Sequence, residues 1–180
     1  DAIAAQQAGF AALAMTSARI ANDDFERLVR KLRGVEAVYL MQDNELSAIG
    51  VESAIKTART LEREGVKCLV ATVPTLAKHD EARAAFERIV GPKGMESLMA
   101  APAQKRPGLV STLVPPDKAE DAAKLFAASK VDVADFLANG GTVDALAKAI
   151  DGARDAIEAA IDCVRKVDDP AEQARAIAPL

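Results

Sequence analysis

The chain has 180 residues, of which 50% are apolar and 28% are charged, and its formal net charge is −4. This composition suits a globular protein of one domain, or of one domain with an appendage. The negative charge argues against a protein that holds nucleic acid through overall positive charge. No apolar run approaches the roughly 18 residues that span a membrane, and the first residues lack the basic region of a signal peptide. We therefore expect a cytoplasmic protein with no membrane partner.

The scarce residue types exclude further classes of protein. Cys68 and Cys163 lie far apart in the chain and there is one histidine, which excludes a zinc module and a disulfide scaffold. Aromatic residues make up only 3% of the chain, too few for a base-stacking sheet of the RRM or OB type. The core must therefore consist mainly of Ala, Leu, Ile and Val, which suits helices packed on a short parallel sheet.

The first half of the chain alternates between apolar runs and amphipathic segments. The pattern predicts a helix over residues 1–8, a strand over 10–15, a helix from Asn22 or Asp23 to Gly34, a strand over 35–41, a helix over 51–61 that stops at Gly65, and a strand over 66–73. Because each connection is short, these elements imply right-handed crossovers and a parallel sheet with helices on both faces. The predicted fold class is therefore α/β and Rossmann-like.

The second half is predicted to be mainly helical, with one irregular stretch. Helices are expected over 78–90, from Asp117 to about Ala128, from Val143, over 151–167 and from Asp168 onward. Five prolines and three glycines between residues 91 and 116 indicate a loop, although residues 108–114 could form a further strand. The chain opens without methionine and stops without a visible helix cap, so we expect that both of its ends are cut.

Acidic residues stand where the predicted strands end. Asp43 and Glu45 follow the strand over 35–41, and their alternate spacing in an extended segment points both side chains to one side. Ligands of open parallel sheets bind beyond the carboxyl ends of the strands. Two carboxylates on one side repel each other unless a cation lies between them, and Mg²⁺ or Mn²⁺ prefers such oxygen ligands. Asp132 and Asp135 form a second acidic pair, and Asp1 is a further candidate ligand of the metal.

Capping is the alternative interpretation of these acids. Asp43 and Asn44 could simply cap a helix that begins near Ser47, since acidic residues favour helix N-termini. Asp132 and Asp135 could likewise cap the turn that follows them. The sequence alone leaves both interpretations open.

The other polar candidates carry weaker signals. Lys56 and Lys130 could contact phosphate, although surface lysines are usually only solvated. His79 is expected to be exposed, and Cys68 to be a buried strand residue. Lys93, Lys105 and Arg106 of the predicted loop could touch nucleic acid, or could simply be solvated.

The acidic motif stands in a more specific context. Asp43-Asn44-Glu45 follows a buried strand, precedes a helix that contains Gly50, and lies upstream of Lys130-Val131-Asp132-Val133-Ala134-Asp135-Phe136-Leu137. In this arrangement the sequence resembles the Toprim domains of DNA primases. Residues 1–10 match the family's first motif from its aspartate onward, residues 43–45 with Gly50 match the second, and residues 130–137 look like the third motif of phage and plasmid primases. The tail from residue 149 is similar to the helical segment that follows Toprim in bacterial primases.

The match departs from the family in two places. The glutamate of the first motif would lie four residues before Asp1 and is not in this chain. The segment between Pro74 and Lys130 is longer than in most relatives. The resemblance implies a Toprim-like metal-binding domain over 1–150, and over 151–180 the start of a C-terminal helical segment.

The resemblance implies metal-dependent nucleotidyl transfer that makes short RNA primers. The substrates would be nucleoside triphosphates, the template single-stranded DNA, and a replicative helicase a further partner. Asp43 and Glu45 would be the catalytic residues and main ligands of Mg²⁺ or Mn²⁺. Asp1, Asp132 and Asp135 would lie nearer a second ion, with Lys130 and Lys56 on phosphate. Without the first glutamate, this chain alone is expected to be weakly active or inactive.

Two other functions remain open at this point. Toprim domains also serve nucleases and topoisomerases, although the sole tyrosine, Tyr39, lies inside a predicted strand, which disfavours a topoisomerase. A non-catalytic module that binds a nucleotide or docks a helicase is the third candidate.

Overall fold

The computed structural model describes residues 2–13 and 22–165 of the chain. At its centre, β1 (Val38–Gln42) and β2 (Cys68–Thr72) form a two-stranded parallel sheet, with Val38 opposite Cys68 and Gln42 opposite Thr72. α3 (Ile49–Arg63) makes the crossover between them. The described chain is thus a mixed α/β fold with a small sheet and mostly helices. The strands predicted over 35–41 and 66–73 are confirmed; the first begins three residues later and ends one residue later than predicted, and the second has shorter bounds.

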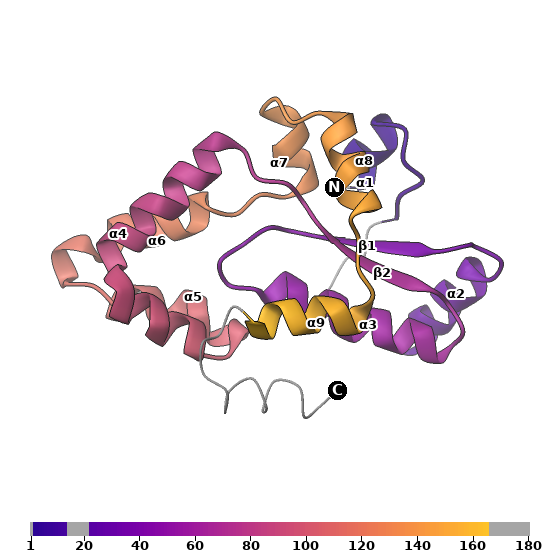
Figure 1. The fold of residues 1–180 in the computed structure, drawn as a ribbon, viewed down its shortest axis with the longest axis horizontal. Coiled ribbons are helices and arrows are strands. Elements are labelled where there is room, and N and C mark those ends of the chain that lie inside the picture. The colour runs from indigo at the N-terminus through magenta and orange to yellow at the C-terminus, as the bar shows by residue number, and fades with distance from the viewer. Residues whose placement is uncertain (1, 14–21, 166–180) are drawn as a thin grey trace.

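Helices cover both sides of this sheet. The remaining α-helices are α1 (Ala2–Gln7), α2 (Asn22–Leu32), α4 (Ala77–Ala100), α5 (Arg106–Leu109), α6 (Ala119–Ala128), α7 (Val133–Ala138), α8 (Val143–Asp151) and α9 (Ala156–Arg165), with 3₁₀ turns η1 (Ala103–Lys105), η2 (Val110–Thr112) and η3 (Pro116–Lys118). Figure 1 shows α3 and α9 on one side of the strands and α1, α7 and α8 on the other. Among the described residues, no helix is both long and apolar enough to cross a bilayer.

The main core lies between the sheet and α3. The helix turns Ile55, Ala58 and Leu61 inward, at the spacing of one helical face, against Cys68 and Val70 of β2. Residues of α2 and α9 complete this core, which comprises Val29, Leu32, Ile55, Ala58, Leu61, Val66, Cys68, Val70, Ala156 and Ala160. Ala156 and Ala160 of α9 therefore pack in the same core as α3 and β2. The domain boundary at residue 150 stays a prediction.

A second, separate core holds the helices between β2 and α7. Its buried residues are Phe86, Val90, Leu98, Val110, Val114 and Ala122. The prediction of a loop over 91–116 is wrong, and residues 106–112 form helical turns where a strand over 108–114 was considered. α4 bends at Gly91, whose φ of 71° lies outside the helical range, and then continues. Pro92 opens the new turn, where the missing N–H costs no hydrogen bond, and the apolar residues beyond it pack on Phe86.

Two other boundaries differ from prediction. A strand was predicted over 10–15, but residues 10–13 form no strand of the sheet. The rest of that segment lies outside the described residues. The helix predicted from residue 151 begins only at Ala156. Asp155 caps it by accepting hydrogen bonds from the backbone N–H groups of Ile157 and Glu158, while Arg154 pairs with Val70 of β2. The helical segment predicted from Asp168 also lies outside the described residues.

Candidate functional site

Two segments far apart in the chain pair with each other beyond the carboxyl end of β1. Asn44 and Val131 form an antiparallel bridge, with N···O distances of 2.9 and 3.0 Å. In such a bridge the neighbours of the paired residues point together to the opposite face. Asp43 and Glu45 therefore share one side with Lys130 and Asp132. We call these four residues the acidic edge.

Lys130 is the cation of the acidic edge. Its Nζ lies 2.7 Å from Oδ2 of Asp43, with side chains 44% and 33% exposed respectively. The hydrogen bond to Asp43 is the largest cause that raises the pKa of Lys130 above 10.5. Burial opposes this rise, and the negative charges of Asp43, Glu45 and Asp132 add to it. Three carboxylates thus act on one ammonium group.

Glu45 and Ser47 hold the start of α3. The Glu45 Oε1 atom accepts a hydrogen bond of 3.0 Å from the N–H of Gly50, and the Ser47 hydroxyl accepts one of 3.3 Å from Ile49. Glu45 and Ser47, rather than Asp43 and Asn44, therefore bind the free N–H groups at the start of α3. A Cβ at Gly50 would lie 3.6 Å from Glu45 Oε1, which is an ordinary contact, so space does not require glycine there.

Asp132 and Asp135 belong to different surroundings although both lie at the start of α7. Asp132 Oδ1 caps the helix by accepting a 2.7 Å hydrogen bond from the N–H of Asp135, as the capping interpretation predicted. The Asp135 carboxylate instead faces α4, where it lies 3.2 Å from Lys78 and 2.6 Å from His79, and it accepts a 2.8 Å hydrogen bond from Asn139. We call Lys78, His79, Asp135 and Asn139 the Asp135 cluster.

The structure corrects the expectation that His79 is exposed. Its side chain is 2% exposed, because the first turn of α4 lies against α7. The N–H of Leu76 donates to Nδ1 at 3.4 Å, which leaves Nε2 to carry a proton and donate to Asp135. Burial works against ionisation of Asp135, but the hydrogen bonds from Lys78 and His79 outweigh it and lower the pKa of Asp135 below 3.8.

Asn44 and Arg83 are functional candidates that the sequence analysis missed. The Asn44 Nδ2 atom donates to the carbonyl of Val73 at 3.1 Å, and its Oδ1 accepts from Arg83 at 3.0 Å. Asn44 therefore ties the loop after β1 to the end of β2 and to α4. Its position between two acids was the only signal in the sequence, since Arg83 stands 39 residues away.

Arg106 joins the segment of the second core to the loop that precedes α3. Its buried guanidinium donates to the carbonyls of Ala101, Met99 and Ser47 at 3.0, 2.8 and 3.2 Å. The prediction that Arg106 belongs to a solvated or nucleic-acid-binding loop is therefore wrong. The bond to Ser47 links the helical segment to the loop that precedes α3.

The remaining candidates do not join the acidic edge in the described part of the chain. Lys56 is exposed on α3, and no ion pair there connects it to Asp43 or Glu45. Asp1 lies outside the described residues. Cys68 is buried as predicted, and burial followed by the charge of Glu62 raises the pKa of its thiol to about 11.

The acidic edge is not a ready-made metal centre. Among the described residues, no three His, Cys, Asp or Glu side chains are grouped closely enough to hold an ion together. No family model matches the sequence, and comparisons with curated proteins and with solved structures found no match. Function must therefore be inferred from the chemistry of these side chains.

Proposed function

We propose that the acidic edge binds Mg²⁺ or Mn²⁺ and carries out nucleotidyl transfer as the Toprim domain of a DNA primase. The substrates would be ribonucleoside triphosphates, joined on a single-stranded DNA template. The observation that carries this proposal is that Asp43, Glu45 and Asp132 lie on one side of the bridge together with Lys130, whose Nζ is 2.7 Å from Asp43. The bridge between Asn44 and Val131 brings together the two segments that resemble the second and third Toprim motifs.

The donor set fits a hard divalent cation. All three acids offer carboxylate oxygens, which Mg²⁺ and Mn²⁺ prefer, and one of them, Asp43, already pairs with the positive charge of Lys130. The contacts described above use one oxygen each of Asp43, Glu45 and Asp132. Asp43 and Glu45 would be the main metal ligands, with Asp132 beside them.

In the proposed function, the acidic residues of the edge would bind the metal ion and the lysines would bind phosphate. A divalent ion, when bound, would neutralise the triphosphate and the leaving pyrophosphate. Lys130 can donate to a phosphate oxygen from a position next to the carboxylates, and Lys56 remains a proposed second phosphate contact. The N–H groups of Gly50 and Asp135 orient Glu45 and Asp132 by donating hydrogen bonds to their carboxylates, and the side chains would still have to draw closer together around a bound cation.

One observation favours a non-catalytic alternative. Asp43 is already neutralised by Lys130, so the edge could serve a module that binds a nucleotide through Lys130 or docks a helicase, without any metal. The two functions differ in whether Asp43 and Glu45 are needed to bind a divalent cation.

Calorimetric titration with Mn²⁺ separates the two functions. We expect the wild-type chain to bind Mn²⁺, and Asp43→Ala and Glu45→Ala each to lose most of this binding while keeping the wild-type circular dichroism spectrum. Glu87→Ala, an exposed acid on α4, is the matched control and should bind as the wild type does. Absence of heat with the wild type, or equal binding by Asp43→Ala, would favour the non-catalytic module.

Activity is tested by an assay of primer synthesis. Labelled ribonucleotide joined on a single-stranded template would support primer synthesis, and Asp43→Ala should abolish it. Cleavage of the template without synthesis would instead indicate a Toprim nuclease.

A further inference from the structure

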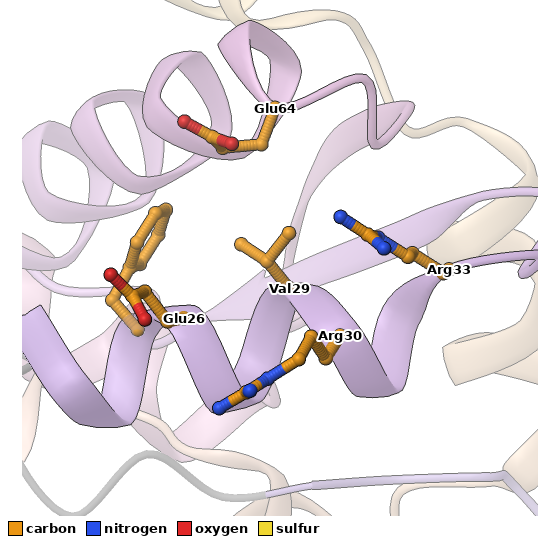
Figure 2. A pocket seen from close by; sticks show the side chains of 6 residues that line it. Glu26, Val29, Arg30, Arg33 and Glu64 are labelled. Carbon is orange, nitrogen blue, oxygen red and sulfur yellow. The ribbon is translucent and has the colours of Figure 1, made fainter.

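A pocket of about 480 Å³ lies between α2 and the end of α3, away from the acidic edge. Its lining residues are Phe25, Glu26, Val29, Arg30, Arg33 and Glu64 (Figure 2). Because α2 precedes β1 and α3 precedes β2, the pocket lies near the amino ends of the strands. Figure 1 shows α2 at the right, where the strands begin, and α4 to α6 at the left, beyond their carboxyl ends.

The rim of the pocket carries opposite charges over an apolar floor. Val29 is 6% exposed and belongs to the main core, and Phe25 is half-buried beside it. In the described part of the chain, no ion pair joins Glu26, Arg33 or Glu64 to another residue. Two glutamates beside the arginines would repel a phosphate group. The pocket therefore suits a surface with the reversed charge pattern better than it suits an anion.

The charge pattern on α2 is complementary to itself. Along α2, Glu26 lies three residues before Val29 and four before Arg30, so these side chains neighbour one another on the helix, and Arg33 follows directly after the last residue of α2. A two-fold axis across the helix between Val29 and Arg30 would lay a second α2 antiparallel on the first. Glu26 would then face Arg33 of the partner subunit, and the symmetry would form this contact twice. Arg30 and the largely buried Val29 would lie nearest the axis, with the half-buried Phe25 beside them.

We propose that this face of α2 is the docking surface for a second copy of the chain. The dimer is isologous, with Glu26 and Arg33 as the paired charges and Phe25 and Val29 beneath them. It goes beyond the proposed function and does not depend on it. Since the pocket lies near the amino ends of the strands, both acidic edges remain uncovered at the far ends of the dimer.

A charge exchange on α2 tests this proposal. We expect sedimentation equilibrium of the wild-type chain to give twice the chain mass of 18.9 kDa at micromolar concentration. Glu26→Arg and Arg33→Glu, made singly, each place like charges together twice and should raise the dissociation constant on the order of a hundredfold. The double variant Glu26→Arg/Arg33→Glu reverses both charges and should restore the wild-type dissociation constant. Lys31→Glu makes the same charge change outside the pocket lining and should leave the dimer intact.

Each opposing result would overturn the dimer. A monomeric wild type up to about 100 μM, single variants that dimerise as well as the wild type, or a double variant that stays monomeric would each do so. Thermal melting of the single variants checks that they remain folded, since both side chains are exposed. Loss of affinity for a single-stranded oligonucleotide in Arg33→Glu, with no change in mass, would assign the pocket to nucleic acid instead.

Discussion

The acidic edge and the Asp135 cluster both join an aspartate to a lysine, yet their charge balance is opposite. In the acidic edge, Asp43, Glu45 and Asp132 share the single ammonium of Lys130. In the Asp135 cluster, one carboxylate receives Lys78, His79 and Asn139. A surplus of carboxylates leaves room for a further cation, whereas a carboxylate with several donors is already satisfied. Proximity of acids to a sheet edge therefore does not by itself make each of them a metal ligand.

The largest expected difference between the two regions is in metal affinity. Asp43→Ala should weaken Mn²⁺ binding by about a hundredfold, or ~2.7 kcal/mol, because it removes a proposed metal ligand from the acidic edge. Asp135→Ala should change it less than about twofold, since that carboxylate faces α4. Calorimetry on both variants measures the contrast. Equal losses in the two would show that Asp135 belongs to the metal site.

The stability of the two variants should follow the reverse order. Asp135→Ala leaves the buried Nε2–H of His79 without its acceptor, which should cost about 1–3 kcal/mol in the free energy of unfolding. Asp43→Ala removes only a partly exposed ion pair and should cost less than about 1 kcal/mol. Urea unfolding measures both values. Glu120→Ala, which removes an exposed pair with Lys124, is the control for a surface ion pair.

The acid dependence of stability should also depend on the Asp135 cluster. The pKa of Asp135 is lower in the folded chain than its ordinary value of 3.8, so the unfolded chain binds the proton first. Its contribution is therefore present above that ordinary value and is lost as the pH falls through the lower folded pKa. Asp135→Asn should flatten the loss of unfolding free energy below about pH 4. If the free energy of unfolding of this variant fell with acid as steeply as that of the wild type, Asp135 would not be the group responsible.

The smallest expected effect concerns Lys130. Lys130→Gln removes the cation that competes for Asp43, so Mn²⁺ affinity should rise about threefold to tenfold. Without metal, the free energy of unfolding should fall by less than about 1 kcal/mol. The pKa of Lys130 is raised, so its stabilising contribution is present below pH 10.5 and is lost as the pH rises through the higher folded pKa. Weaker Mn²⁺ binding by Lys130→Gln would show that the lysine assists the metal rather than competing with it.

Local sequence patterns were sufficient for the centre of the fold. The apolar runs that became β1 and β2, and the 3.6-residue repeat of α3, are signals contained within a single element. The same holds for Asp132, because a cap acts on residues two or three positions away. The second core was not predictable in this way. Proline and glycine indicated loops at 91–116, but burial against Phe86 made those residues helical.

In the candidate site, too, some features were predictable from local sequence and others depended on tertiary contacts. The sequence showed Asp43 and Glu45 after a strand, and it showed Lys130 two residues before Asp132. Which of these meet was decided by the pairing of Asn44 with Val131, and by the burial of His79 against Asp135, 56 residues away. Such contacts form only when segments that are distant in the chain pack together. Each segment then buries its side chains against the other, and this burial cannot be recognised within either segment alone. The residue types of the site could therefore be read from the chain, whereas their grouping into an acidic edge and a satisfied cluster depended on tertiary packing.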